Sequence, residues 1–419
     1  MPVIVLSLCV VLIVVFVRLT IERREQGTFV PLMVFSLLIR MVIFVTVVRS
    51  TIFFSHGSAG GDSTAYELWS GIIADYWRRH GVEFVTVDMM PEIGQTALIC
   101  NLFALVNYLN GEPSPFAYTA LAAMVGCMTA IEVFRSAREF GASRRGAYVA
   151  MLAVLFSPAF VFHTSDCYKD GFVAFFTVMS FTGSMRIARK FSVAELLLLL
   201  AWLVGLWFVR FYMVFMCSIP VVVGMLGMKS RSTIRKVLSG LGAVLLVSAG
   251  FVGGVMRSSA MSHMIETYEI SHDSNVVAYN AMGGSGVTFD DGGNPFGAIG
   301  PKLAYTIASP FPWQSGSLGL HIGKIDVFIF YYLIYRAYLA GKRMTVTDRE
   351  ALIQFIAFLV PATVAYATTM ANIGLILRQR MPIVFVTAIL AALSWPERRA
   401  VAPSTAKKAV APRALKAAA

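Results

Sequence analysis

The sequence predicts an all-α protein that crosses a membrane about eleven times. Of its 419 residues, 57% are hydrophobic and only 14% are charged, whereas average proteins are about 25% charged. Apolar runs close to the roughly 20 residues that one crossing requires recur along the chain. The connectors between them alternate between short basic segments and longer segments rich in acidic, glycine, histidine and aromatic residues. This combination is typical of a polytopic helical membrane protein with two chemically different faces.

The apolar runs give the positions of the expected spans. They lie near residues 2–18, 29–48, 115–134, 146–162, 171–185, 192–209, 211–228, 237–256, 324–341, 351–370 and 379–394. Another apolar segment, 96–109, is short and interrupted by Asn101 and Asn107, and a full crossing there would carry the basic connector 135–145 to the other face. We therefore expect segment 96–109 to be re-entrant or interfacial, which is tolerated where protein or a water-filled cavity covers the backbone.

The connectors predict the orientation, because basic loops stay in the cytoplasm. The basic connectors are residues 18–24, 135–145, 186–190, 229–236, 342–349 and the tail after Arg398. The loops 49–113, 163–170 and 257–323 should then face outward, and they contain almost every residue capable of chemistry. The first apolar run has no basic segment before it and no cleavage motif after it, so we expect a retained anchor with its N-terminus outside.

The chain is expected to form one transmembrane catalytic domain over residues 1–398. Residues 399–419 alternate Ala, Pro and Lys or Arg without an apolar period, which predicts a disordered basic cytoplasmic tail. The formal net charge of +12 lies mainly in this tail and the basic connectors, so it indicates topology and lipid headgroup contact instead of nucleic-acid binding. The five cysteines are dispersed without metal-site spacing, and we expect core thiols.

Three aspartates in the outward loops are the candidate catalytic residues. Asp62 follows two glycines and precedes an amphipathic helix expected over 64–80, so it is a candidate cap of that helix and a candidate catalytic carboxylate, and one residue can be both. The very short turn 163–170 contains His163, Asp166, Lys169 and Asp170. Charges so near hydrocarbon are costly unless they pair or face water, which makes them functional candidates. The alternative for this turn is a self-neutralising ion pair that sets the depth of a helix.

Three arginines near the outer surface are candidate anion-binding residues. Arg210 lies between two apolar runs, and Arg378 and Arg380 open the last expected span on the side where basic residues are disfavoured. Guanidinium groups bind phosphate oxygens through two parallel hydrogen bonds, whereas the alternative is a side chain that merely anchors a helix at the surface. Trp313, in the Pro-rich stretch before a span, fits either a cradle for a ring or lipid or a simple aromatic belt.

The pieces together resemble polytopic bacterial GT-C-type integral-membrane glycosyltransferases and the neighbouring O-antigen-polymerase-like proteins of polysaccharide biosynthesis. Four short motifs carry the resemblance. They are Gly-Gly-Asp-Ser at 60–63, Ser-Pro at 157–158 followed by Lys-Asp at 169–170, Ser-Pro-Phe-Pro-Trp at 309–313, and Arg-x-Arg-x-Pro at 378–382. The likeness covers most of the chain in arrangement, but the chain lacks the folded soluble C-terminal domain of the larger family members.

The resemblance implies a glycosyltransferase that uses a polyprenyl-phosphate-linked sugar or oligosaccharide at the external face of the bacterial plasma (inner) membrane. It implies that the external carboxylate Asp62 deprotonates or contacts the acceptor, with a second carboxylate region at Asp166 or Asp170. External arginines would hold the lipid pyrophosphate. The substrate-binding candidates are His163, Lys169, Arg210, Trp313, Arg378 and Arg380.

Two alternatives from the residues stay open beside a single-sugar transferase. They are an O-antigen-type glycan polymerase and a flippase or transporter of lipid-linked glycans; a structural scaffold explains the membrane path but leaves Arg378 and Arg380 without a role. No internal two-fold repeat is evident, which disfavours transport. We expect polyprenyl-linked glycans and membrane lipids as partners, with polysaccharide assembly proteins as further candidates. Mg²⁺ or Mn²⁺ is an expected cofactor only if the loops bring Asp62 together with Asp166 or Asp170.

Overall fold

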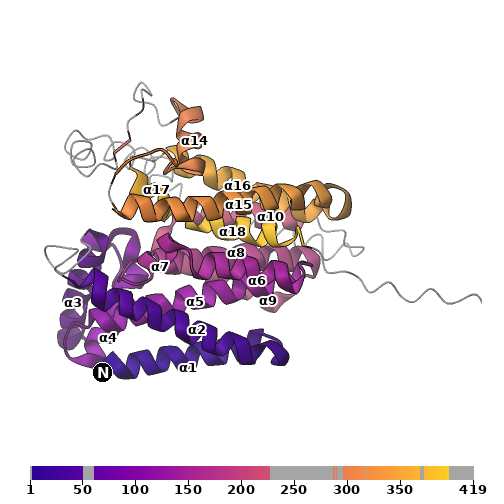
Figure 1. Cartoon of the computed structure of the whole chain (residues 1–419). Helices are drawn as coiled ribbons and strands as arrows, with labels where there is room; N and C mark the ends of the chain where they lie inside the picture. The colour runs from indigo at the N-terminus through magenta and orange to yellow at the C-terminus, as the bar shows by residue number, and fades with distance from the viewer. Residues whose placement is uncertain are drawn as a thin grey trace, which may run out of the picture.

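The computed structural model describes residues 2–50, 61–226, 286, 287, 289, 296–316, 318–368 and 372–395. The described chain is built from helices that run side by side along one long direction (Figure 1). The described residues also contain an isolated antiparallel bridge between Gly286 and Asn372. The expected span 237–256, most of the loop 257–323 and the tail 399–419 lie outside the described residues.

Six described helices are long and apolar enough to cross a membrane. They are α1 (Pro2–Thr20), α2 (Arg23–Ile43) continued by η1 (Phe44–Val48), α5 (Pro115–Glu139), α8 (Asp170–Arg189), α9 (Val193–Arg210) and α16 (Arg349–Thr368). Helices α17 (Ile373–Gln379) and α18 (Met381–Ala392) meet at a bend of 49°, which is the form of either a broken span or a re-entrant segment. The chain is therefore a helical membrane protein, as predicted, but the count of eleven spans is not confirmed.

Two of the expected spans have a different form in the structure. The run 146–162 is divided into α6 (Arg144–Leu155) and α7 (Pro158–His163), because Ser157 accepts a hydrogen bond from the Phe160 amide and Pro158 starts a new helix. Helix α10 (Tyr212–Leu226) falls in the expected span 211–228, whose last residues lie outside the described residues. Helix α15 (Leu318–Thr347) has 30 residues and begins and ends beyond the expected span 324–341.

Two helices of the first predicted loop pack against each other at one end of the bundle (Figure 1). Helix α3 (Asp62–His80) confirms the helix expected over 64–80. Helix α4 (Ala97–Asn110) has 14 residues, about 21 Å at 1.5 Å per residue, which is shorter than the roughly 30 Å hydrocarbon layer. This length agrees with the prediction that segment 96–109 does not cross fully. A 10-residue helix, α14 (Ile299–Ala308), lies near α16.

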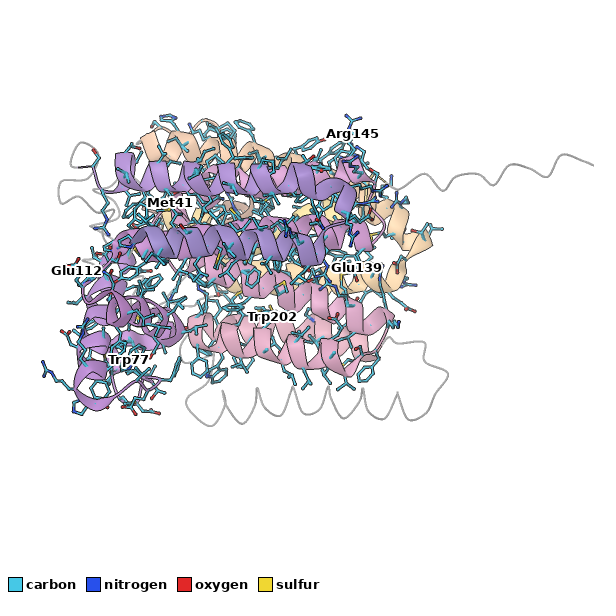
Figure 2. All side chains as sticks on the ribbon, turned by 90° about the horizontal axis from the view of Figure 1, so that it is seen from below. Met41, Trp77, Glu112, Glu139, Arg145 and Trp202 are labelled. Atoms are coloured by element: carbon cyan, nitrogen blue, oxygen red, sulfur yellow. The ribbon has the colours of Figure 1, made fainter. Side chains whose placement is uncertain are left out.

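The basic connectors gather at the opposite end. Arg144 Nε contacts Glu25 Oε1 at 2.8 Å, and Arg189 Nη2 contacts Asp348 Oδ2 at 3.1 Å. Figure 2 shows Arg145 and Glu139 at this end, with Trp77 and Glu112 at the other. We call these the basic end and the α3 end. The described connectors therefore sort into two groups at opposite ends of the bundle, as the alternation in the sequence predicts.

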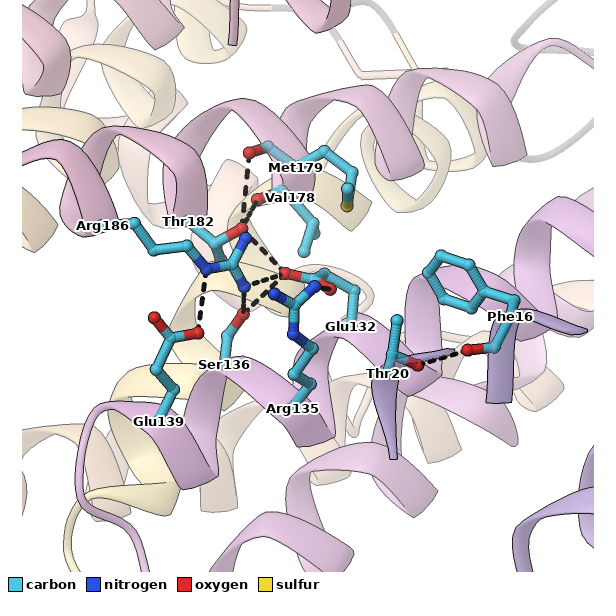
Figure 3. Close-up of polar contacts among 10 residues, drawn as sticks. All are labelled: Phe16, Thr20, Glu132, Arg135, Ser136, Glu139, Val178, Met179, Thr182 and Arg186. Atoms are coloured by element: carbon cyan, nitrogen blue, oxygen red, sulfur yellow. Dashed lines mark hydrogen bonds and ion pairs between the residues drawn. The ribbon is translucent and has the colours of Figure 1, made fainter. Parts of the chain in front are cut away.

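A buried ionic network holds α5 and α8 together toward the basic end (Figure 3). Arg186 Nη2 lies 2.5 Å from Glu132 Oε1, and its Nε lies 2.8 Å from Glu139 Oε2. The Glu132 carboxylate also accepts hydrogen bonds from Ser136 Oγ and Thr182 Oγ1. A charge as buried as Glu132 is tolerated because these partners replace its lost hydration.

Candidate functional site

Arg378 joins two of the three predicted aspartates at the α3 end. Its Nη2 donates to Asp62 Oδ2, and its Nε donates to Asp170 Oδ2 at 2.5 Å. The other oxygen of Asp170 accepts from Arg210 Nη2 at 3.0 Å. Side chains from α3, α8, α9 and α17 thus form one chain of alternating charges, which we call the arginine–aspartate cluster: Asp62, Asp170, Arg210 and Arg378.

Helix ends position the members of this cluster. Asp62 and Asp170 are the first residues of α3 and α8, where the helix dipole favours a negative charge. Arg210 is the last residue of α9 and Arg378 lies in the last turn of α17, where the dipole favours a positive charge. The cap position of α3 belongs to Gly61, so Asp62 is not the helix cap and its carboxylate is directed to Arg378.

The cluster runs from the protein interior to a water-accessible mouth. The side chains of Asp170, Arg210 and Arg378 are 2%, 6% and 15% exposed, whereas that of Asp62 is 45% exposed. Burial opposes ionisation of Asp62, but the charge and the hydrogen bond of Arg378 outweigh it and hold the pKa of Asp62 below its ordinary value. Asp62 is therefore the most exposed member of the cluster.

Lys169 adds a cation beside the cluster. Its Nζ lies 6.0 Å from the centre of the Tyr66 ring, and it forms no salt bridge with any residue that the structure describes. Burial and the charges of Arg210 and Arg378 lower the pKa of Lys169 to about 7. With Lys169 protonated, three cations face two carboxylates, and this excess of positive charge suits an anionic ligand.

His163 lies in the same region with one ring nitrogen available. Its Nδ1 is 2.7 Å from the carbonyl oxygen of Ala159, so the neutral ring donates through Nδ1 and keeps the Nε2 lone pair. Burial lowers the pKa of His163, although the nearby charges of Asp170 and Asp62 act in the opposite direction. The side chain therefore tends to be neutral and able to accept a proton at Nε2.

Asp166, the third predicted aspartate, belongs to a neighbouring group. Its Oδ1 accepts from the Cys167 amide at 2.7 Å, its Oδ2 is buried without a hydrogen bond to a described residue, and burial raises its pKa. Ligand atoms of Glu67, Asp166 and Cys167 lie within 4.8 Å of one another. However, Arg49 already pairs with Glu67, and a thiol does not suit Mg²⁺ or Mn²⁺, which prefer oxygen ligands.

The position between Asp62 and Asp170 does not suit a metal ion either, because the Arg378 guanidinium bonds to both carboxylates. Dependence on Mg²⁺ or Mn²⁺ thus stays a prediction from the sequence.

Arg380 and Trp313 lie in a different part of the molecule. Arg380 is 1% exposed and donates through Nη1 to the carbonyl oxygen of Ser309 at 2.7 Å and to that of Ile307 at 3.2 Å. Trp313 is 78% exposed and stacks on Phe311 with the ring centres 5.1 Å apart. No contact between these two side chains and the arginine–aspartate cluster is found within the described ranges.

Sequence reasoning missed three residues that shape the site. Tyr66 and Tyr168 form its aromatic wall, and the Arg378 guanidinium carbon lies 5.1 Å from the centre of the Tyr168 ring. The fully buried Arg40 donates to Thr164 Oγ1 at 2.7 Å and to the Leu155 carbonyl oxygen at 2.9 Å, and so anchors the turn that carries His163 and Lys169. An arginine inside an apolar run is itself a signal that could have found Arg40.

The arginine–aspartate cluster and Lys169 can bind an anion at one end of the helix bundle. The proton-accepting groups Asp62 and His163 lie beside them. No protein-family model matches the chain, and no curated protein matches it. The function must therefore be inferred from the residues and their geometry.

Proposed function

We propose that this protein is a membrane-embedded glycosyltransferase that takes a sugar or oligosaccharide from a polyprenyl phosphate at the external membrane face. Its role would be in bacterial cell-surface polysaccharide biosynthesis. The observation that supports this proposal best is the arginine–aspartate cluster at the α3 end, together with the adjacent Lys169, which forms no salt bridge with a described residue. The resemblance in the four sequence motifs points to the same reaction.

The reaction needs a partner for the leaving anion. The acceptor hydroxyl oxygen forms a bond to the anomeric carbon, and the bond from that carbon to the phosphate oxygen breaks, so the electron pair leaves with the phosphate. In this proposal, Lys169 and the donors of Arg378 and Arg210 that face the site stabilise the developing charge. Positive groups stabilise a developing negative charge more strongly in a site that excludes most water, because the effective dielectric constant is low there.

The reaction also needs a group that takes the proton of the acceptor hydroxyl. Asp62, at the exposed mouth of the cluster, is the base that the sequence predicts. His163 is an alternative, because its Nε2 is an acceptor without a hydrogen bond to any described residue. General-base catalysis by either group would be worth about 10²–10⁴-fold in rate.

The charge distribution supports an external site. The described basic connectors meet at the end opposite the cluster, and basic loops are retained in the cytoplasm. On this basis the α3 end faces outward, the N-terminus is outside and the C-terminus is cytoplasmic. The prenyl tail of the donor would stay in the bilayer beside the helices, and only its phosphate end would reach the cluster.

A transporter of lipid-linked glycans is the alternative from another class. Transport requires charges or polar groups along a path through the membrane. In the described residues, the arginine–aspartate cluster is confined to one end, and the second network, around Glu132 and Arg186, has its carboxylate oxygens hydrogen-bonded. This distribution favours transfer at one face. Transfer of one sugar and polymerisation of whole repeat units remain two forms of the same proposal.

The test is a transfer assay on purified protein in detergent with extracted polyprenyl-linked glycans, with products identified by mass spectrometry. Wild type should form a glycosylated product, and Asp62→Asn and Lys169→Met should lose most of this activity. Lys342→Met is the matched control, because Lys342 lies in the last part of α15, away from the cluster, with its Nζ 5.7 Å from the Tyr338 ring. Binding of the glycolipid without any product from wild type would instead support the transporter.

A further inference from the structure

Arg380 carries a buried positive charge that its neighbours satisfy only in part. Only Nη1 is bonded, to carbonyl oxygens at the C-terminal end of α14 and just after it. Nε and Nη2 are buried and form no hydrogen bond within the described chain. Buried guanidinium donors without partners are costly, so an arginine in this state points to a missing acceptor.

The nearest carboxylate does not fill this role. Asp326 is 5% exposed, and its charge acts on Arg380. However, Asp326 accepts a hydrogen bond from Ser157 Oγ, and no salt bridge joins it to Arg380 in the described part of the chain. The guanidinium therefore keeps a net positive charge and two donors without a hydrogen bond in the described part of the chain.

Arg380 also lines a cavity of about 220 Å³. It is lined by Thr306, Ile307, Phe330, Ile334, Leu359, Thr363, Arg380, Ile383 and Thr387. Residues 380, 383 and 387 share one face of α18, and the pairs on α15 and α16 are each four residues apart. The cavity consequently extends along the helices for about 10 Å from Arg380.

The rest of the lining is mostly apolar, and its edge is open on an apolar surface. Ile307, on the rim, is 38% exposed, and Val360, next to Leu359, is 55% exposed. A water cluster would find few polar partners here, since a buried water needs about three hydrogen bonds. A hydrocarbon chain with an anionic end matches both parts of the cavity.

We propose that this cavity binds a lipid phosphate, with the phosphate oxygens at the Arg380 guanidinium and one hydrocarbon chain along α15, α16 and α18. The volume is below the about 300–1,000 Å³ of a pocket for a whole drug-sized ligand, so only the first part of one chain enters it. The site is separate from the transfer site proposed above. Its occupant is a lipid of the surrounding bilayer.

The experiment is equilibrium binding of dodecyl phosphate to the full-length protein in a neutral detergent, followed by native mass spectrometry. Dodecanol and inorganic phosphate are the two comparison ligands. Dodecanol supplies the hydrocarbon chain without the phosphate, and inorganic phosphate supplies the anion without the chain. Dodecyl phosphate should bind at least about tenfold more tightly than either, since hydrogen bonds to a charged group are worth this much or more. The assay requires no transfer activity, so this proposal and the proposed function can fail separately.

Three variants complete the test. Arg380→Gln should weaken dodecyl phosphate binding about tenfold or more, and Thr363→Phe, which fills the cavity but keeps the arginine, should do the same. Ile353→Phe on the exposed face of α16 is the control and should bind like wild type. Equal binding in wild type and Thr363→Phe, or equal binding of dodecanol, would overturn the proposal. Tight binding of inorganic phosphate alone would replace the lipid with a free anion and also overturn it.

Discussion

Asp170 and Arg378 are 208 residues apart in the sequence, yet their side chains meet at 2.5 Å in the interior of the α3 end. The same arginine also reaches Asp62, and the same aspartate also binds Arg210. Each charge in this chain thus depends on partners from other helices. Removal of one member should affect both the local fold and ligand binding, whereas removal of an exposed ion pair should affect neither.

Arg378→Ala should lower the stability of the protein by about 3–5 kcal/mol, because it leaves Asp170 with one partner in place of two and removes the only salt-bridge partner of Asp62 among the described residues. Arg189→Ala is the matched control. Arg189 and Asp348 are 38% and 44% exposed, so the loss of their salt bridge should cost about 1 kcal/mol or less.

The measurement for both variants is thermal unfolding in detergent, followed by circular dichroism. If the unfolding temperature falls no further in Arg378→Ala than in Arg189→Ala, the arginine–aspartate cluster does not stabilise the helix ends that it joins.

Lys169 should give anion binding a pH dependence near neutrality. Its pKa is about 7, so the ammonium is charged below this pH and neutral above it. The affinity for a phosphate-bearing lipid should therefore be highest below pH 7 and decline between about pH 7 and 9. Binding of a polyprenyl phosphate can be measured over this range by microscale thermophoresis. In Lys169→Met the decline should disappear, and a wild-type affinity that stays constant up to pH 9 would contradict this role of Lys169.

The sequence predicted the membrane fold well where an uninterrupted apolar run equals one helix. Helices α1, α5, α8 and α9 are examples, because their length alone identifies them. The prediction failed where a local signal divides a run. Ser157 and Pro158 start a new helix inside the apolar run 146–162, and both signals were present in the sequence but were outweighed by hydropathy.

The candidate site was predicted in its residue types but not in its grouping. Charges in short turns and at span ends marked Asp62, Lys169, Asp170, Arg210 and Arg378, which the structure brings together. Arg378 and Arg380 were predicted to act together, but Arg378 reaches Asp62 and Asp170 whereas Arg380 reaches the Ser309 carbonyl oxygen. Residues two apart in a helical segment point to different sides, so the two arginines serve different parts of the molecule.

Gly171→Ala should disturb the turn that carries His163 and Lys169. A β-carbon at residue 171 would lie 2.9 Å from Thr164 Cγ2, and Arg40 holds Thr164 in place through a hydrogen bond. This overpacking should cost about 1–3 kcal/mol. Gly300→Ala is the control, since nothing lies within 4 Å of the added atom. The unfolding temperatures of Gly171→Ala and Gly300→Ala are compared. Equal unfolding temperatures would show that the turn accommodates the added methyl group without loss of stability.

The identity of the base should appear in the pH profile of transfer. The pKa of Asp62 is below the ordinary aspartate value of about 3.9, so an Asp62 base is ionised, and the rate is constant, from about pH 5 upward until Lys169 loses its proton.

A His163 base gives a different profile. Its pKa is below the ordinary value of about 6.5, and the rate must fall as the pH decreases through that lower value, because only the neutral ring accepts a proton. We expect the flat acidic limb of Asp62, with Asp62→Asn inactive and His163→Asn retaining the wild-type profile. An acidic limb that disappears in His163→Asn would instead assign the base to His163 and leave Asp62 to position the acceptor and Arg378.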